Sequence, residues 1–176
     1  MRNVIKKSAI AAGVLLGTVG VAQAATIDPG PGQYTFSGPA TLSAPFADLT
    51  CTLSLTGDVQ KDGNGGVIVT VSDGAATGGF LGICSAVGFE FPWVANVPAS
   101  QIPADPTQPI GAMFENVRVS VLGSDCSANS EGATVPAMFS NGDPISEASS
   151  FSFNTPVGDC SVMGTIDAQT DVNVTQ

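Results

Sequence analysis

The sequence contains no histidine, one tryptophan, one tyrosine and five basic residues. Histidine is the usual general base for a serine or cysteine nucleophile, so its absence argues against nucleophilic catalysis. Sugar-cleaving sites normally combine paired carboxylates with aromatic platforms, and Tyr34 and Trp93 are the only polar aromatic residues here. We therefore predict a protein that is not an enzyme, with no catalytic residue and no cofactor.

Positive charge is scarce, and three of the five basic residues, Arg2, Lys6 and Lys7, lie at the amino terminus. The rest of the chain keeps Lys61 and Arg118 against fifteen carboxylates, a net charge of about −13. Phosphate backbones and anionic lipid headgroups are bound by clustered Lys or Arg, so we expect no nucleic acid partner and no charged membrane partner. The charge favours solubility, with the collection of divalent cations as the alternative.

Residues 1–24 have the pattern of a secretory signal peptide: a basic start, an apolar run over residues 9–21, and Ala22-Gln23-Ala24 as a small-residue cleavage site. Its removal leaves about 150 residues, the size of one domain. No later apolar run approaches the roughly 20 residues of a membrane span, so none is predicted. We expect a flexible leader over residues 25–32, a single β domain over residues 33–176, and an extracellular or cell-surface location, with the periplasm as the alternative.

Four cysteines are present, Cys51, Cys84, Cys126 and Cys160, and none lies within four residues of another. Zinc sites usually use close cysteine pairs, so an even count in a secreted chain predicts disulfides instead. Three connectivities are open. We favour Cys51 with Cys84 and Cys126 with Cys160, because pairs that are near in sequence need the least long-range organisation before oxidation.

Short runs of alternating apolar and polar residues recur along the chain, separated by turn formers among 21 glycines and 12 prolines. The pattern predicts an all-β, disulfide-stapled sandwich of the immunoglobulin-like or a similar antiparallel type, with roughly 8–10 short strands. A small barrel has the same pattern. Residues 51–59 and 67–71 should form a hairpin, and residues 97–111 should cross between sheets or cap an end. The other predicted strands are residues 34–37, 40–43, 80–86, 89–96, 113–121, 135–139, 151–154 and 160–168.

The glycine-rich stretch at residues 62–66 invites comparison with a calcium loop. The loop motif needs glycine at its sixth position, where this chain has Val67, and the chain then continues into a strand. A hairpin turn is the better interpretation, and no metal site is predicted. A weak calcium site formed by Asp125 and Asp159 is the alternative.

The densest aromatic stretch surrounds the single tryptophan, in Glu90-Phe91-Pro92-Trp93. Trp93 is interpreted first as a core residue, because large aromatic side chains are mostly buried. The second interpretation is an anchor for a ligand or partner. On that interpretation, the candidate binding residues are Phe89, Phe91, Trp93 and Phe114.

Several segments together resemble the bacterial alkane-oxidation protein activator family, the PraB-like proteins. The segments are Leu49-Thr50-Cys51-Thr52-Leu53-Ser54-Leu55-Thr56-Gly57, Cys84 with Pro92-Trp93 eight residues later, Glu115-Asn116-Val117-Arg118-Val119 leading to Cys126, and Gly158-Asp159-Cys160-Ser161-Val162-Met163-Gly164-Thr165. The resemblance implies a small secreted protein associated with growth on alkanes and with biofilm or adhesion, without enzymatic activity. The proline-rich stretch of residues 98–109 and the strong acidity depart from the expected family pattern.

We therefore expect a secreted, acidic protein that acts by association, in extracellular matrix, biofilm or adhesion, or at a hydrophobic surface. Strand edges could support self-association into oligomers or fibres. The alternative is a monomeric module that binds a hydrophobic small molecule between its sheets.

Overall fold

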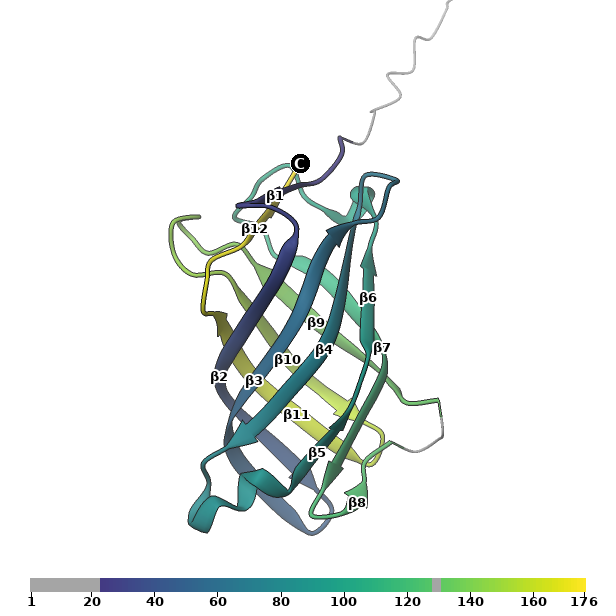
Figure 1. Ribbon diagram of the computed structural model, residues 1–176, viewed down its shortest axis with the longest axis vertical. Helices are drawn as coiled ribbons and strands as arrows, with labels where there is room; N and C mark the ends of the chain where they lie inside the picture. Colours follow the sequence, from purple (N-terminus) through teal and green to yellow (C-terminus); the bar gives the residue numbers. More distant parts are fainter. Residues whose placement is uncertain (1–22, 128–130) are drawn as a thin grey trace, which may run out of the picture.

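The computed structural model describes residues 23–127 and 131–176 (Figure 1). The predicted signal peptide falls almost wholly outside these residues. The described part forms twelve strands and two short 3-10 helices. In chain order they are β1 (Thr26–Asp28), β2 (Gly32–Ala44), β3 (Ala47–Lys61), β4 (Val67–Thr77), η1 (Phe80–Ala86), β5 (Val87–Glu90), β6 (Trp93–Val97), η2 (Ala99–Gln101), β7 (Ile110–Val121), β8 (Ser124–Asp125), β9 (Ala133–Ser140), β10 (Ser150–Val157), β11 (Cys160–Ala168) and β12 (Asn173–Thr175).

The main sheet closes on itself as an eight-stranded antiparallel barrel. Around the barrel the strands follow the order β2, β3, β4, β6, β7, β9, β10 and β11, and β11 pairs with β2 again. The all-β prediction is confirmed, but the predicted sandwich is wrong because β7 pairs with β9 as well as with β6. Alternation of apolar and polar residues has the same period in both architectures, so it could not separate them.

Several barrel strands are longer than the sequence predicted: β2 has 13 residues, β3 has 15 and β7 has 12. The break expected at Gly38-Pro39 does not occur, and β2 runs through it. A Cβ atom on Gly38 would collide with the backbone oxygen of Thr165, so glycine here permits a close approach between β2 and β11. Gly57 likewise permits a close approach of β3 to the backbone of Thr70 on β4, beside a register shift between these strands. Such positions let long strands bend around a barrel.

The strand predicted over residues 80–86 is wrong, because this segment is the 3-10 helix η1. Gly78, Gly79 and Gly82 have positive φ angles, and Leu81 has φ 55°. These left-handed residues turn the chain out of the sheet after β4. The apolar run that suggested a strand is instead a protruding loop.

The other strand predictions hold with shifted boundaries. The predicted hairpin is formed by β3 and β4, and residues 160–168 are β11. Residues 89–96 divide into β5 and β6 around Phe91-Pro92. The strands predicted at 113–121, 135–139 and 151–154 are the longer β7, β9 and β10. Within the described residues, no helix has the length and apolar character to cross a membrane.

The inward-facing side chains fill the barrel with one continuous apolar core. At its centre, Phe151 packs against Phe36, Phe139 and Phe114, with ring centroids 4.9, 5.0 and 5.8 Å apart. These rings come from β10, β2, β9 and β7, so they join opposite walls of the barrel. Aromatic pairs at these distances add to the free energy gained from burial alone.

One end of the barrel, uppermost in Figure 1, is covered by chain and called the capped end below. Within the stretch predicted as a flexible leader, β1 pairs with β12 across this end. Ile102, in the proline-rich segment between β6 and β7, is 2% exposed, so this segment caps the end rather than crossing between sheets. The buried amide of Asn141 donates to the backbone oxygens of Pro106 and Val174, at 2.9 and 2.8 Å, and accepts from the Val174 N–H.

Candidate functional site

The most distinctive feature of the described residues is exposed and internal apolar surface. Among the described residues, no group of three or more cysteine, aspartate and glutamate side chains is placed to hold a metal ion. Asp62 accepts hydrogen bonds from the N–H groups of Asn64 and Gly66, at 2.7 and 2.8 Å, which is the geometry of a turn residue. All four cysteines are in disulfides.

The end opposite the capped end carries large apolar side chains in solvent, and we call it the apolar end. Leu81 and Phe80 are 90% and 83% exposed, and Phe46 is 54% exposed. They lie on η1 and on the turn between β2 and β3, which Figure 1 shows at its lower end. The five residues that define the apolar end are Phe46, Phe80, Leu81, Ile83 and Leu122.

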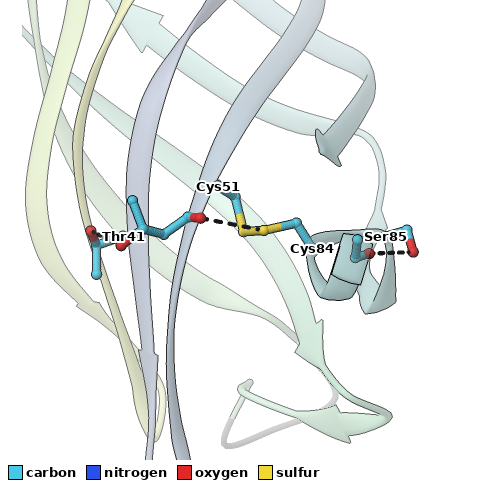
Figure 2. The surroundings of a disulfide bond; sticks show 6 residues. Thr41, Cys51, Cys84 and Ser85 are labelled. Atoms are coloured by element: carbon cyan, nitrogen blue, oxygen red, sulfur yellow. Dashed lines mark hydrogen bonds between the residues drawn. A yellow bond between two sulfur atoms is a disulfide. The ribbon is translucent and has the colours of Figure 1, made fainter. Parts of the chain in front are cut away.

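A disulfide holds the most exposed part of the apolar end in place. Cys51 of β3 and Cys84 of η1 are bonded, with their Cα atoms 5.7 Å apart, and Figure 2 shows η1 fastened beside the strand by this bond. The Ser85 hydroxyl donates to the Gly82 carbonyl at 2.9 Å, within the same turn. Phe80 and Leu81 are thereby presented outward on a short tethered loop.

Basic side chains are kept away from the apolar end. Lys61 closes β3 at the capped end, and Arg118, on the barrel wall, pairs with Glu90 at 3.1 Å. In the described part of the chain, the charged residues closest in sequence to two of the apolar turns are acidic: Asp48 follows Phe46 at the start of β3, and Asp125 follows Leu122 on β8. The apolar end therefore has no attraction for an anionic surface.

The capped end carries more negative charge. One of its carboxylates, Asp105, accepts hydrogen bonds from the backbone N–H and the hydroxyl of Thr107, at 3.0 and 2.8 Å. These bonds lower the pKa of the Asp105 carboxyl from its ordinary value. The carboxylates of the described loops and short strands at this end are Asp28, Asp62, Asp105, Asp143, Glu147 and Asp171.

The barrel interior contains a second apolar feature, a cavity of about 90 Å³. Its lining includes side chains from every barrel strand. Tyr34 and Ser161 provide its only hydroxyl groups, and the Tyr34 hydroxyl donates to the Gly30 carbonyl at 2.5 Å. Well-packed protein interiors hold few voids larger than one water molecule, so this cavity is unusual in size.

The predicted binding residues are brought together only in part. Trp93 is 6% exposed, in agreement with the core interpretation, and its indole N–H donates to the Glu90 carbonyl at 2.6 Å. Phe89 and Phe91 pack on it, with ring centroids 5.8 and 4.8 Å away. Phe114 belongs instead to the Phe151 cluster. Phe89, Trp93 and Phe114 line the cavity. Phe91 packs on Trp93 but does not line the cavity.

The residues of the apolar end are not among the binding residues predicted from the sequence. A signal for them was present, because each lies in or beside a turn: Pro45-Phe46, Gly79-Phe80-Leu81-Gly82-Ile83 and Leu122-Gly123. Large apolar residues between turn formers are out of place in a solvated loop. In residues 80–83 the apolar content also fits a strand, which is the structure predicted for them.

The two disulfides join Cys51 to Cys84 and Cys126 to Cys160, as the sequence analysis favoured. Together with the closed barrel and its apolar interior, they define a small disulfide-stapled β-barrel. The family model described as alkane oxidation protein activator PraA/PraB-like matches residues 1–176, and the chain belongs to that family. The resemblance noted from the sequence is thereby confirmed. No curated protein and no solved structure matches the chain.

Proposed function

We propose that the protein is a secreted, non-enzymatic member of its family that associates with uncharged hydrophobic surfaces, such as alkane droplets, through the apolar end. The observation that carries this proposal is the gathering of five exposed large apolar side chains at one end of the barrel. Contiguous exposed apolar surface marks interaction sites on soluble proteins. The family description supplies the chemistry of the partner, since it refers to alkane oxidation.

Secretion is supported by the signal-peptide pattern of residues 1–24 and by the two disulfides, which persist in oxidising compartments. A location in the extracellular matrix or at the cell surface would bring the apolar end into contact with hydrocarbon outside the cell. Association with such surfaces would then underlie adhesion or biofilm behaviour.

The energetics favour adsorption. Burying a large apolar side chain contributes roughly 1.5–3 kcal/mol, so Phe46, Phe80 and Leu81 together could contribute about 5–9 kcal/mol before the cost of orientation is subtracted. Because η1 is tethered, little additional ordering is required. The absence of basic residues among the described residues of this end favours an uncharged surface over an anionic membrane.

The test is pendant-drop tensiometry of the oxidised mature protein at a hexadecane–water interface. The wild type should lower the interfacial tension, and a Phe80→Ser/Leu81→Ser variant should need at least about tenfold more protein for the same effect, given the area removed. The matched control is Met138→Ser/Met163→Ser, which removes two exposed apolar side chains from the outer barrel wall. Equal adsorption by the wild type and the Phe80/Leu81 variant, with both folded, would contradict the proposal.

Self-association is a second candidate function, favoured by the same apolar end, since two copies could bury these loops against each other. Addition of strands is a weaker route, because closure of the barrel leaves few free edges. Light scattering over a concentration series separates the two candidates. Oligomers that disappear in the Phe80→Ser/Leu81→Ser variant would favour self-association, and a monomer that still adsorbs would favour surface binding.

A further inference from the structure

The barrel wall is incompletely paired between β9 and β10. These strands share three residue pairs, from Ser150 with Ser140 to Ser152 with Met138, whereas β10 and β11 share eight. In the described part of the chain, residues 133–137 of β9 and 153–157 of β10 form no pairs with each other. At this place only side chains separate the barrel interior from its surroundings.

The interior cavity and an outer groove meet at this interruption. The groove, about 690 Å³, lies on the outer face of β2, β3, β9, β10 and β11. Ala137 and Phe153 line both the groove and the cavity, and the exposed Met138 and Met163 border the groove. Methionine side chains adapt readily to apolar ligands, which suits the entrance to a binding site.

Phe153 is the larger of the two side chains that line both spaces. It belongs to the inward-facing set of β10, yet it is only half-buried, unlike Phe151 and Val157 of the same set. Its partner on β11 is Gly164, which offers no side chain to hold the ring. Phe153 takes part in none of the described aromatic ring pairs, and it packs against the core as a partly buried side chain.

The shape of the cavity suits a straight chain. On β2 alone its lining extends from Tyr34 to Leu42, which is about 26 Å along the strand. Its volume of about 90 Å³ accommodates on the order of six to nine water-sized groups, so it is long and narrow. Methylene groups are of similar size to water, and a flexible chain fits such a space better than a ring does.

The electrostatics exclude a charged ligand head inside the barrel. The described basic residues, Lys61 and Arg118, do not line the cavity, and its few hydroxyl groups cannot neutralise a carboxylate. An unpaired buried carboxylate is strongly disfavoured. The negative charge of the whole chain adds to this selection against anions.

We infer that the barrel interior binds one uncharged linear alkyl chain, which enters from the outer groove past Phe153. This site is separate from the apolar end, and it does not depend on the proposed surface association. Phe89, Phe114 and Trp93 form part of its wall. A saturated hydrocarbon would make the same contacts with this lining that the apolar core makes with itself.

The experiment is a Trp93 fluorescence titration of the oxidised protein with n-octane, 1-octanol and octanoate, each below its solubility limit. Trp93 is the single tryptophan and lines the cavity, so occupation should change its emission. Octane and octanol should saturate at one molecule per protein, and octanoate should bind at least about tenfold more weakly. No saturable change with octane, or equal binding of octanoate, would overturn the inference.

Variants locate the site. Ala137→Phe fills the cavity at its entrance and should abolish the fluorescence response. Thr134→Phe, on the outer face of the same strand and outside both the cavity and the groove, should retain it. Val135→Leu adds one methylene to the same lining and should weaken octane binding several-fold, which keeps the test informative should the larger substitution not fold. Retention of full affinity by a folded Ala137→Phe protein would contradict the assignment.

The same titration separates this inference from the surface proposal. The Phe80→Ser/Leu81→Ser variant should lose adsorption and still bind octane with unchanged affinity. Loss of both activities in that variant, with the fold intact, would show that the fluorescence change reports the apolar end and would overturn the interior site.

Discussion

The two ends of the barrel are built from loops of different length and different chemistry. The capped end is covered by β1, β12 and the segment around η2, and its solvent-facing loops carry carboxylates. At the other end, η1 and two tight turns project phenylalanine and leucine side chains into solvent. Exposed apolar loops lower solubility, so their placement at the end away from the carboxylate-rich loops is consistent with the proposed end-on association with a hydrophobic surface.

The largest effect on the difference between the two ends is expected from removing a disulfide. Replacing Cys51 and Cys84 by serine should lower the free energy of unfolding by about 3–4 kcal/mol, as expected for a loop of this length. It should also weaken adsorption, because η1 is no longer held beside β3. Chemical denaturation and tensiometry of the same samples measure the two effects.

Replacing Cys126 and Cys160 by serine is the matched control, since the two disulfides close loops of 33 and 34 residues. The loss of stability should be similar, about 3–4 kcal/mol, but adsorption of the folded protein should be unchanged. Equal weakening of adsorption in both variants would show that global stability, rather than the tether on η1, controls the apolar end.

At the capped end, Asn141→Ala should lower the free energy of unfolding by about 2–3 kcal/mol, because it removes three hydrogen bonds in a buried position and leaves their partners unpaired. Thermal and denaturant unfolding measure this loss. Adsorption at the hexadecane interface should be unaffected. A change in adsorption would mean that the two ends do not act independently.

A smaller effect should follow from adding charge to the apolar end. Leu81→Lys places a cation on a side chain that is 90% exposed, so stability should change by less than about 0.5 kcal/mol. Binding to vesicles containing anionic lipid should strengthen by about 1 kcal/mol, roughly fivefold. Cosedimentation with anionic and neutral vesicles measures this change in binding. The control is Ile145→Lys, which adds the same charge at the opposite end.

The smallest effect on stability should come from lowering the pH, through protonation of Asp105 at the capped end. The folded-state pKa of Asp105 is lowered, so its hydrogen bonds with Thr107 stabilise the protein at pH values above the unfolded pKa near 3.8. This contribution should disappear as the pH falls through the lowered folded-state pKa. Between pH 6 and pH 2, the free energy of unfolding should fall slightly less for Asp105→Asn than for the wild type. An identical pH profile would contradict the role of Asp105.

Much of the fold could be predicted from sequence because its signals are local. The alternation in residues 51–59 and the turn formers after Lys61 predicted the β3–β4 hairpin, and residues 160–168 are a strand with the predicted bounds. The strand prediction for residues 80–86 is wrong because Gly78, Gly79 and Gly82 adopt positive φ angles that turn this apolar segment out of the sheet. The candidate site was predicted only in part: Phe89, Trp93 and Phe114 line the cavity, but Phe153 gave no distinguishing signal.

The sequence by itself determined the all-β class, the acidic charge and the scarcity of reactive groups, because these follow from composition and from a period of two. It could favour a disulfide pairing but not choose between a sandwich and a barrel, which share that period. Only the tertiary structure decided that β7 meets β9, that the apolar turns gather at one end, and that the wall opens between β9 and β10. Those features depend on contacts between residues far apart in the chain, and no local pattern specifies them.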